Sequence, residues 1–401
     1  MKKRVLSLIP KSIWVLGFVS LLMDISSEII HSILPLFMTK VLSASALTIG
    51  IIEGVAESTT LIIKVFSGIV SDYLGKRKTV VLIGYSLSTV TKLIFAITSS
   101  IFMIFSARFI DRIGKGIRGA PRDALIADLS PPAIRGASFG LRQSLDTVGA
   151  FIGPVFAMVL LYLTANNFRF IFLCAFLPAV IAVLLLVFGV QEKEKKGFKG
   201  ERKILWNDIK RLPFSYWWVV ILGGIFTLSR FSEAFLVLKA SEAGMTLYLI
   251  PLTLGVMSFF YALTAYPFGR LADHISHTFL LVLGIFFLIV SNLFLAVSQT
   301  WIGIYVGVSL WGIHMGITQG LFALMVSQTI PENLRGTGYG IFSLVSGLGM
   351  LVASILAGII WDTLGSQYTF YCGIMLSTLT LIVFLFPKKK LLPFPKNDKY
   401  T

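Results

Sequence analysis

Cysteine and charge are both scarce in this chain. Only two of the 401 residues are cysteines, Cys174 and Cys372, and both lie inside apolar stretches. This excludes a disulfide framework and a cysteine-rich metal site. Charged residues make up 13% of the chain and hydrophobic residues 56%, whereas a soluble domain has roughly 25% charged residues. This balance predicts a protein that lies mostly in lipid.

Common enzyme motifs are missing as well. The sequence contains no phosphate-binding loop of the G-x-x-x-x-G-K-[ST] kind and no H-E-x-x-H zinc motif. No catalytic pairing with a nucleophile is visible. We therefore predict that the protein is not an enzyme and uses no metal, nucleotide or other cofactor.

The net charge of +16 would suggest a nucleic-acid partner in a soluble protein, but its distribution indicates otherwise. When the apolar runs are taken as membrane spans, 23 lysines and arginines fall on one side of the membrane and three on the other. Cytoplasmic loops carry the excess of positive charge. The asymmetry predicts a multi-pass protein of the inner (cytoplasmic) membrane, with both termini in the cytoplasm and no nucleic-acid partner.

Apolar runs of about 20 residues, long enough to cross roughly 30 Å of hydrocarbon, occur twelve times. They predict an all-α membrane protein with twelve transmembrane helices. The first run contains Asp24 and Glu28 and no small-residue cleavage site, so we interpret it as a retained span rather than a signal peptide. The predicted spans are residues 12–38, 46–70, 79–98, 101–124, 137–163 and 168–190, then 214–238, 246–268, 278–298, 300–326, 337–361 and 367–386.

Two short signatures recur half a chain apart, with shifts of 201 and 200 residues. They are Gly68-x-x-x-Asp72, which returns as Gly269-x-x-x-Asp273, and Pro131-x-x-x-Arg135, which returns as Pro331-x-x-x-Arg335. A duplicated membrane half is typical of transporters. We therefore predict two pseudo-symmetric six-helix bundles around a central cavity, residues 1–190 and 214–386. Residues 191–213 are expected to be a cytoplasmic linker with an amphipathic helix, and residues 387–401 a basic tail.

Charged side chains recur along the fourth predicted span at steps of three and four residues, which places them on one helical face. A charge near the bilayer centre costs about 3 kcal/mol on insertion scales unless it meets water or a partner. This face is therefore expected to point at the cavity rather than at lipid. Its members are Arg108, Asp111, Arg112, Lys115, Arg118 and Arg122.

Carboxylates occur at matching depths on neighbouring spans. In a low dielectric they either pair with arginines or take up a proton, which is the chemistry of a proton-coupled carrier. We expect Asp24, Glu57, Asp111, Arg112 and Asp146 to form one layer near the midplane. The candidates for proton coupling are Asp24, Glu28, Glu57, Asp111, Asp146 and His314.

The cationic cavity favours an anionic or carboxylate-rich substrate, such as an organic acid or a carboxylate siderophore, because arginine binds carboxylates bidentately. An alternative remains open, in which these charges are structural ion pairs between helices. Lys92, nearer a helix end, is expected to reach the lipid headgroups. The substrate-binding candidates are Arg108, Arg112, Lys115, Arg142, Arg230, Glu233, Trp311 and Gln319.

Two small-residue motifs are candidates for gating, Gly68, Asp72 and Arg77 after the second span, and Gly149, Gly153 and Pro154 in the fifth. Glycine permits close helix approach, and Asp72 is expected to accept from a neighbouring helix N-terminus. Tight packing alone would also explain the second motif.

These motifs resemble those of the major facilitator superfamily, over nearly the whole chain. The loop after the second span resembles its signature, Arg112-x-x-Lys115-Gly116 its helix 4 motif, and Gly149 to Pro154 its helix 5 antiporter motif. Asp24-Ile-Ser-Ser-Glu28 and Glu53-Gly-Val-Ala-Glu57 are similar to a subgroup of prokaryotic members. Lys115 departs from the pattern, because the family prefers glutamine there.

The resemblance implies alternating access, with helices 1, 4, 7 and 10 lining the cavity, Arg112 in proton coupling and Asp72 in the loop gate. We predict a monomeric secondary active transporter that is driven by protons and binds a small molecule. Two alternatives are a multidrug or metabolite efflux antiporter and a membrane sensor or scaffold that transports nothing. The direction of transport stays open.

Overall fold

The computed structural model describes residues 8–192, 212–272, 274–330 and 334–385. The predicted amphipathic linker helix and the basic tail lie outside these residues. Helices and short connections make up the described chain, which shows no strand in these ranges.

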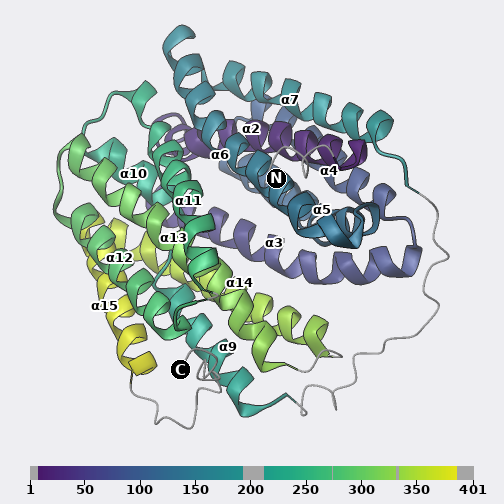
Figure 1. The fold of residues 1–401 in the computed structure, drawn as a ribbon. Coiled ribbons are helices and arrows are strands. Elements are labelled where there is room, and N and C mark those ends of the chain that lie inside the picture. Colours follow the sequence, from purple (N-terminus) through teal and green to yellow (C-terminus); the bar gives the residue numbers. More distant parts are fainter. Residues whose placement is uncertain (1–7, 193–211, 273, 331–333, 386–401) are drawn as a thin grey trace.

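Six long helices form the first half of the molecule (Figure 1). They are α2 (Lys11–Lys40), α3 (Ala46–Leu74), α4 (Arg77–Ile97), α5 (Ile101–Leu129), α6 (Arg135–Leu163) and α7 (Phe168–Gly189), with the 3-10 turn η1 (Pro132–Ile134) before α6. The second half contains α9 (Phe214–Leu228), α10 (Ala234–Glu242), η2 (Leu247–Leu249), α11 (Leu252–Leu271), α12 (His277–Val297), α13 (Trp301–Thr329), α14 (Arg335–Leu364) and α15 (Ser366–Leu385).

The crossings agree with the twelve predicted spans. Within the described ranges, ten helices are long and apolar enough to cross a membrane. Helix α5 has the length but carries too many charges for this criterion, and α9 and α10 together make the remaining crossing. The fold is therefore the predicted all-α membrane fold of twelve crossings in two halves.

Local sequence sets where several helices begin and end. The side chains of Ser45, Ser100 and Ser276 each accept a hydrogen bond from a backbone amide in the first turn of α3, α5 and α12, which satisfies amides that have no partner inside the helix. Helix α3 ends at Gly75, whose φ of 65° lies in the left-handed region that glycine adopts without strain.

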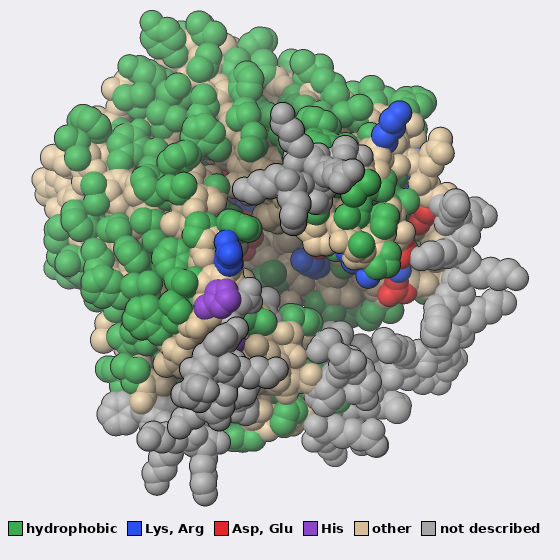
Figure 2. All heavy atoms as spheres, in the orientation of Figure 1, with side chains coloured by type: hydrophobic (Ala, Val, Ile, Leu, Met, Phe, Trp, Pro, Cys, Tyr) green, Lys and Arg blue, Asp and Glu red, His purple; other side chains and the backbone are tan. Residues whose placement is uncertain are grey.

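Large apolar side chains cover the outside of the molecule (Figure 2). Phe188 on α7 is 79% exposed and Phe102 on α5 is 75% exposed. Apolar exposure of this extent would be unstable in water, and a helix satisfies most of its backbone groups internally, which is what a lipid environment demands. The structure is that of a multi-pass membrane protein.

The helix connections lie on two opposite faces. We call the tail face the one where both ends of the described chain lie, with the connections at residues 75–76 and 130–134 and the C-terminal ends of α11 and α13. We call the far face the one with the connections at residues 41–45, 98–100, 164–167, 243–251, 298–300 and 365. Helices α3 and α14, α6 and α11, and α2 and α10 join the two halves.

The seventh crossing differs from the prediction, which placed one continuous helix over residues 214–238. The structure has α9 ending at Leu228 and α10 beginning at Ala234. Serines stabilise the break. The Ser229 hydroxyl donates to the Phe226 carbonyl (2.6 Å), and the amide of Ser232 donates to the hydroxyl of Ser354 on α14 (3.2 Å). Both candidate residues of this crossing, Arg230 and Glu233, lie in the break.

Glycine allows the backbones of α2 and α6 to touch. A Cβ atom on Gly149 would lie 2.6 Å from the carbonyl oxygen of Leu21 and 3.0 Å from Cβ of Asp24, and one on Gly153 would lie 2.6 Å from Cβ of Glu28. The predicted gating residues Gly149 and Gly153 therefore position the helix that carries the carboxylates of the first half.

We expect Gly149→Ala to lower the melting temperature of the purified protein, because overpacking costs typically 1–3 kcal/mol. Gly140 on the same helix is the matched control, since a Cβ there meets nothing within 4 Å. Gly140→Ala is expected to leave the melting temperature unchanged or to raise it slightly, because alanine favours a helix. Equal melting temperatures for the two variants would contradict the packing explanation.

Candidate functional site

A hollow separates the two halves, and basic and acidic side chains are visible inside it (Figure 2). The contacts that close it lie toward the far face, where the start of α3 meets the end of α14 and Tyr162 meets Tyr248. The cavity therefore opens toward the tail face.

The sequence predicted that the charged face of α5 points at this cavity. The structure differs, because several of these side chains point at neighbouring helices instead. Arg108 and Arg112 point at α3, where Arg108 binds Glu53 through two hydrogen bonds (2.9 and 2.6 Å) and Arg112 lies 3.1 Å from Glu57. Asp111 and Arg118 instead point at α4. An α-helix has 3.6 residues per turn, so side chains that follow one another at spacings of three and four residues do not line up. Together they cover a wide arc of the helix surface.

Lys92 does not reach the lipid headgroups, so that prediction is wrong. Its ammonium group is 1% exposed and donates to Asp111 (3.1 Å) and to the hydroxyl of Ser27 (3.3 Å). Asp111 is thereby paired with a lysine inside the first half. Arg118 donates to Ser88 (2.6 Å) and lies 4.7 Å over the Tyr85 ring.

Two other carboxylates of the predicted layer, Asp24 on α2 and Asp146 on α6, are neighbours. Asp146 on α6 lies 3.2 Å from Arg142 and 3.8 Å from Arg122, and Arg142 also donates to Gln143. The carboxyl groups of Asp24 and Asp146 interact electrostatically across the contact between α2 and α6. Two neighbouring carboxylates repel each other unless one of them takes up a proton.

Glu28 is connected to the buried Glu53 through an imidazole. His31 on α2 places Nδ1 3.4 Å from Glu28 and Nε2 3.8 Å from Glu53. Glu28 is 21% exposed to the cavity and Glu53 is fully buried. Neither His31 nor Glu53 was among the sequence candidates, although the spacings Glu28-x-x-His31 and Glu53-x-x-x-Glu57 placed both on the candidate faces.

Two cations of the described residues have carboxylates nearby but form no direct ion pair. Within the described ranges, Lys115 and Arg230 make no ion pair shorter than 4 Å and no side-chain hydrogen bond. Lys115 lies among Asp24, Glu28, Glu57 and Asp146 without contacting any of them. Arg230 stacks over the Phe226 ring at 5.8 Å. One unpaired cation therefore comes from each half.

The second half contributes few further groups. Glu233 interacts electrostatically with Arg230 of its own half and with His31, Glu28 and Glu57 of the first half. Gln319 is exposed and accepts a hydrogen bond from Tyr261 (2.9 Å). Trp311 and His314 are buried instead, and His314 bonds through Nδ1 to the Gly284 carbonyl (2.9 Å). The structure therefore does not bring His314 together with the carboxylates.

The gating candidates lie at both ends of the cavity. A Cβ atom on Gly68 would be in ordinary contact with Ala120 of α5 (3.4 Å), and Pro154 packs against Gly255 of the second half. Arg77 joins Asp72 (3.1 Å) to Asp128 (3.2 Å) on the tail face.

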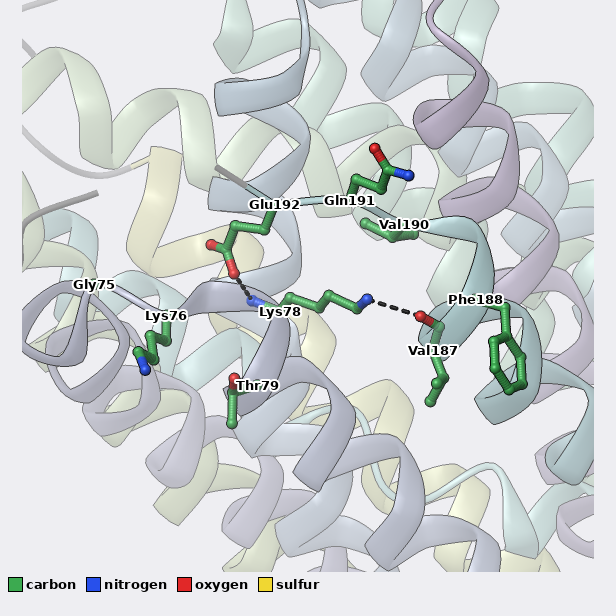
Figure 3. Close-up of a pocket in the computed structure, with 9 residues that line it drawn as sticks. All are labelled: Gly75, Lys76, Lys78, Thr79, Val187, Phe188, Val190, Gln191 and Glu192. Carbon is green, nitrogen blue, oxygen red and sulfur yellow. Dashed lines mark hydrogen bonds between the residues drawn. The ribbon is translucent and has the colours of Figure 1, made fainter. Parts of the chain in front are cut away.

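A carboxylate from the end of α7 caps the start of α4. Glu192 accepts from the amides of Arg77 (2.9 Å) and Lys78 (2.8 Å) at the start of α4, while the Lys78 ammonium group donates to the Val187 carbonyl (2.8 Å). Figure 3 shows the contacts of Lys78 with Glu192 and Val187, in a tail-face pocket of about 640 Å³. The pocket is lined by the α3–α4 turn and the end of α7, so it is separate from the charged cavity.

Known proteins resemble this chain along its length. The family model described as Major Facilitator Superfamily matches residues 16–354 and, in a second match, residues 252–399. An uncharacterized MFS-type transporter of Methanocaldococcus jannaschii is 34% identical over 386 residues, which cover 94% of this chain and 95% of the relative. The glucose transporter GlcP of Staphylococcus epidermidis is 23% identical over 400 residues, covering 88% and 86%.

A solved structure shows the same fold. The bacterial homologue of the human lysosomal transporter Spinster, in an inward-facing and occupied conformation, has a TM-score of 0.78 at 12% identity and covers 96% of this chain and 98% of its own. The twelve crossings in two halves, the loop after α3 and the full-length matches agree, and the chain belongs to the major facilitator superfamily of membrane transporters.

Proposed function

We propose that this transporter carries a small organic anion and couples its movement to protons. The observation that supports the anion is the pair of unpaired cations, Lys115 from the first half and Arg230 from the second. A buried guanidinium group without a partner costs free energy. A carboxylate that binds both cations would remove this cost and would also join the two halves, which is what a substrate must do in alternating access.

The proton-coupling groups are Asp24 with Asp146, and Glu28 with His31. These carboxyl groups surround Lys115 without contacting it. In a low dielectric each must pair with a cation or take up a proton, so protons and the substrate compete in setting the charge around Lys115. With the tail face in the cytoplasm, as the positive charge of its loops favours, the conformation seen here is the inward-open one.

The test is binding of citrate, succinate and acetate to the purified protein, read as a thermal shift, because a ligand of the folded state stabilises it by mass action. We expect Arg230→Gln and Lys115→Gln each to weaken binding about 10- to 100-fold, since a hydrogen bond to a charged group contributes roughly 1.5–3 kcal/mol. Arg270→Gln is the matched control, because Arg270 is an exposed arginine of the same half.

Carboxylate binding that survives both cavity variants would refute the anion proposal. Stabilisation by lipophilic cations such as ethidium, with none by carboxylates, would assign the protein to drug efflux and leave the arginines as structural partners. Uptake and efflux by proteoliposomes with an imposed pH gradient would then fix the direction. A transporter-like sensor would bind a ligand but accumulate nothing.

A further inference from the structure

The far face is closed by a carboxylate from one half that caps a helix of the other. Asp362, at the end of α14, accepts hydrogen bonds from the amides of Ala46 (3.0 Å) and Leu47 (2.8 Å), the first two residues of α3. These amides have no partner inside their own helix, and a helix N-terminus favours negative charge. The third amide of this turn is satisfied within its own half, because Thr48 donates to Ser45 (3.2 Å).

Below this cap the two helices touch along a seam of small residues. A Cβ atom on Gly358 of α14 would lie 2.5 Å from Cα of Leu47, and one on Gly50 would overlap the carbonyl oxygen of Ser354. The backbones are thus in contact for two turns. Asp362 is the polar end of a close and otherwise apolar contact, so α3 and α14 cannot part on this face unless its hydrogen bonds break.

A pseudo-symmetric contact on the other side of the far face also joins the two halves, but it is aromatic and uncharged. Tyr162, at the end of α6, packs edge-on against Tyr248 in η2, with ring centroids 5.5 Å apart. Tyr162 and Asp362 are 200 residues apart, and Leu47 and Tyr248 are 201 residues apart, which are the shifts of the repeated signatures. The duplicated halves therefore meet twice on this face, once through an aromatic pair and once through a carboxylate on a helix N-terminus.

We propose that Asp362 is a latch between the halves, and that its two hydrogen bonds hold the far face closed in this conformation. Removing the carboxylate shifts the protein toward conformations that are open on the far face. The Tyr162–Tyr248 contact closes the pseudo-symmetric position without a charge, so replacing Asp362 removes only one of the two contacts that favour the closed far face. This proposal does not depend on the substrate or on proton coupling.

The test measures the distance between the halves by double electron–electron resonance on the full-length protein in nanodiscs. Spin labels on Ser99→Cys and Gln299→Cys report the far face, because both residues are exposed there and belong to opposite halves. Cys174 and Cys372 are replaced by alanine in every sample. Asp362→Ala and Asp362→Asn are expected to raise the ratio of long to short distances roughly fivefold, the effect of about one net hydrogen bond.

Glu242→Gln is the matched control. Glu242 is an exposed acid of the same face whose ion pair, with Lys239 at 4.0 Å, stays within its own half. Its distance distribution should equal that of the unmodified protein. Should Asp362→Ala fail to fold, Asp362→Asn, which keeps the size of the side chain, decides the question. An unchanged distribution in a folded Asp362 variant, or the same change in Glu242→Gln, overturns the proposal.

Discussion

Glu53→Gln is expected to destabilise the protein by roughly 3–5 kcal/mol, the usual cost of removing one partner of a buried ion pair. Glu53 is fully buried, and both of its oxygens accept from Arg108, whose side chain is 2% exposed. The variant leaves the guanidinium charge of Arg108 in the interior without a carboxylate. Urea or thermal unfolding of the purified protein in one detergent would measure the loss.

The chain offers a matched control one helical turn away. Glu57 on the same helix is 32% exposed and has a single ion-pair contact, with Arg112, so Glu57→Gln is expected to cost much less. The double variant Glu53→Leu with Arg108→Leu should be more stable than either single variant, because it leaves no unpaired charge. Equal losses for Glu53→Gln and Glu57→Gln would show that the buried pair has no special structural role.

Asp24→Asn is expected to abolish accumulation driven by a pH gradient. The asparagine side chain is neutral and cannot release a proton, so it imitates the permanently protonated form of Asp24. A carrier fixed in that state cannot bind and release the proton at this site, so the pH gradient no longer drives accumulation. The concentration ratio of substrate across the membrane should fall to about one. Exchange of labelled for unlabelled substrate should continue.

The measurement uses proteoliposomes and a carboxylate found in the binding test. Asp123→Asn is the control, because Asp123 lies on α5 toward the tail face and contacts Arg122 at 3.5 Å, away from the Asp24 carboxyl. Undiminished accumulation by Asp24→Asn would remove this pair from proton coupling. A loss of exchange as well as accumulation would instead show that Asp24 is needed for binding.

The membrane spans could be predicted from the sequence because their signal is local. Twenty apolar residues in a row are visible without knowing their neighbours, and all twelve crossings were found. The break between α9 and α10 was not predicted, because residues 225–238 contain neither proline nor glycine. It is stabilised by Ser354 of α14, 122 residues further along the chain than Ser232.

The partners of the charges were harder to predict than their presence. Spacing showed that the charges of α5 share part of its surface, but not that α3 and α4 both pack on that surface from different sides. A rotation of one residue, about 100°, decides whether a side chain points at a helix or at the cavity. The sequence assigned Arg108 to substrate binding, but its side chain points at α3 and pairs with Glu53. Lys115 and Arg230 point at the cavity and form no ion pair among the described residues.

The break in the seventh crossing makes α10 a short separate helix, which needs contacts with other helices to stay folded. Helix α10 has nine residues, fewer than the 12–15 or so at which an isolated helix becomes marginally stable in water. Seven consecutive residues of it, 234–240, are buried, and it packs against α2 and α3 of the first half. The helical state of α10 thus depends on packing, and part of that packing comes from the opposite half. Amide hydrogen exchange in α10 should accelerate whenever the halves separate there, so this segment is a built-in reporter of their contact.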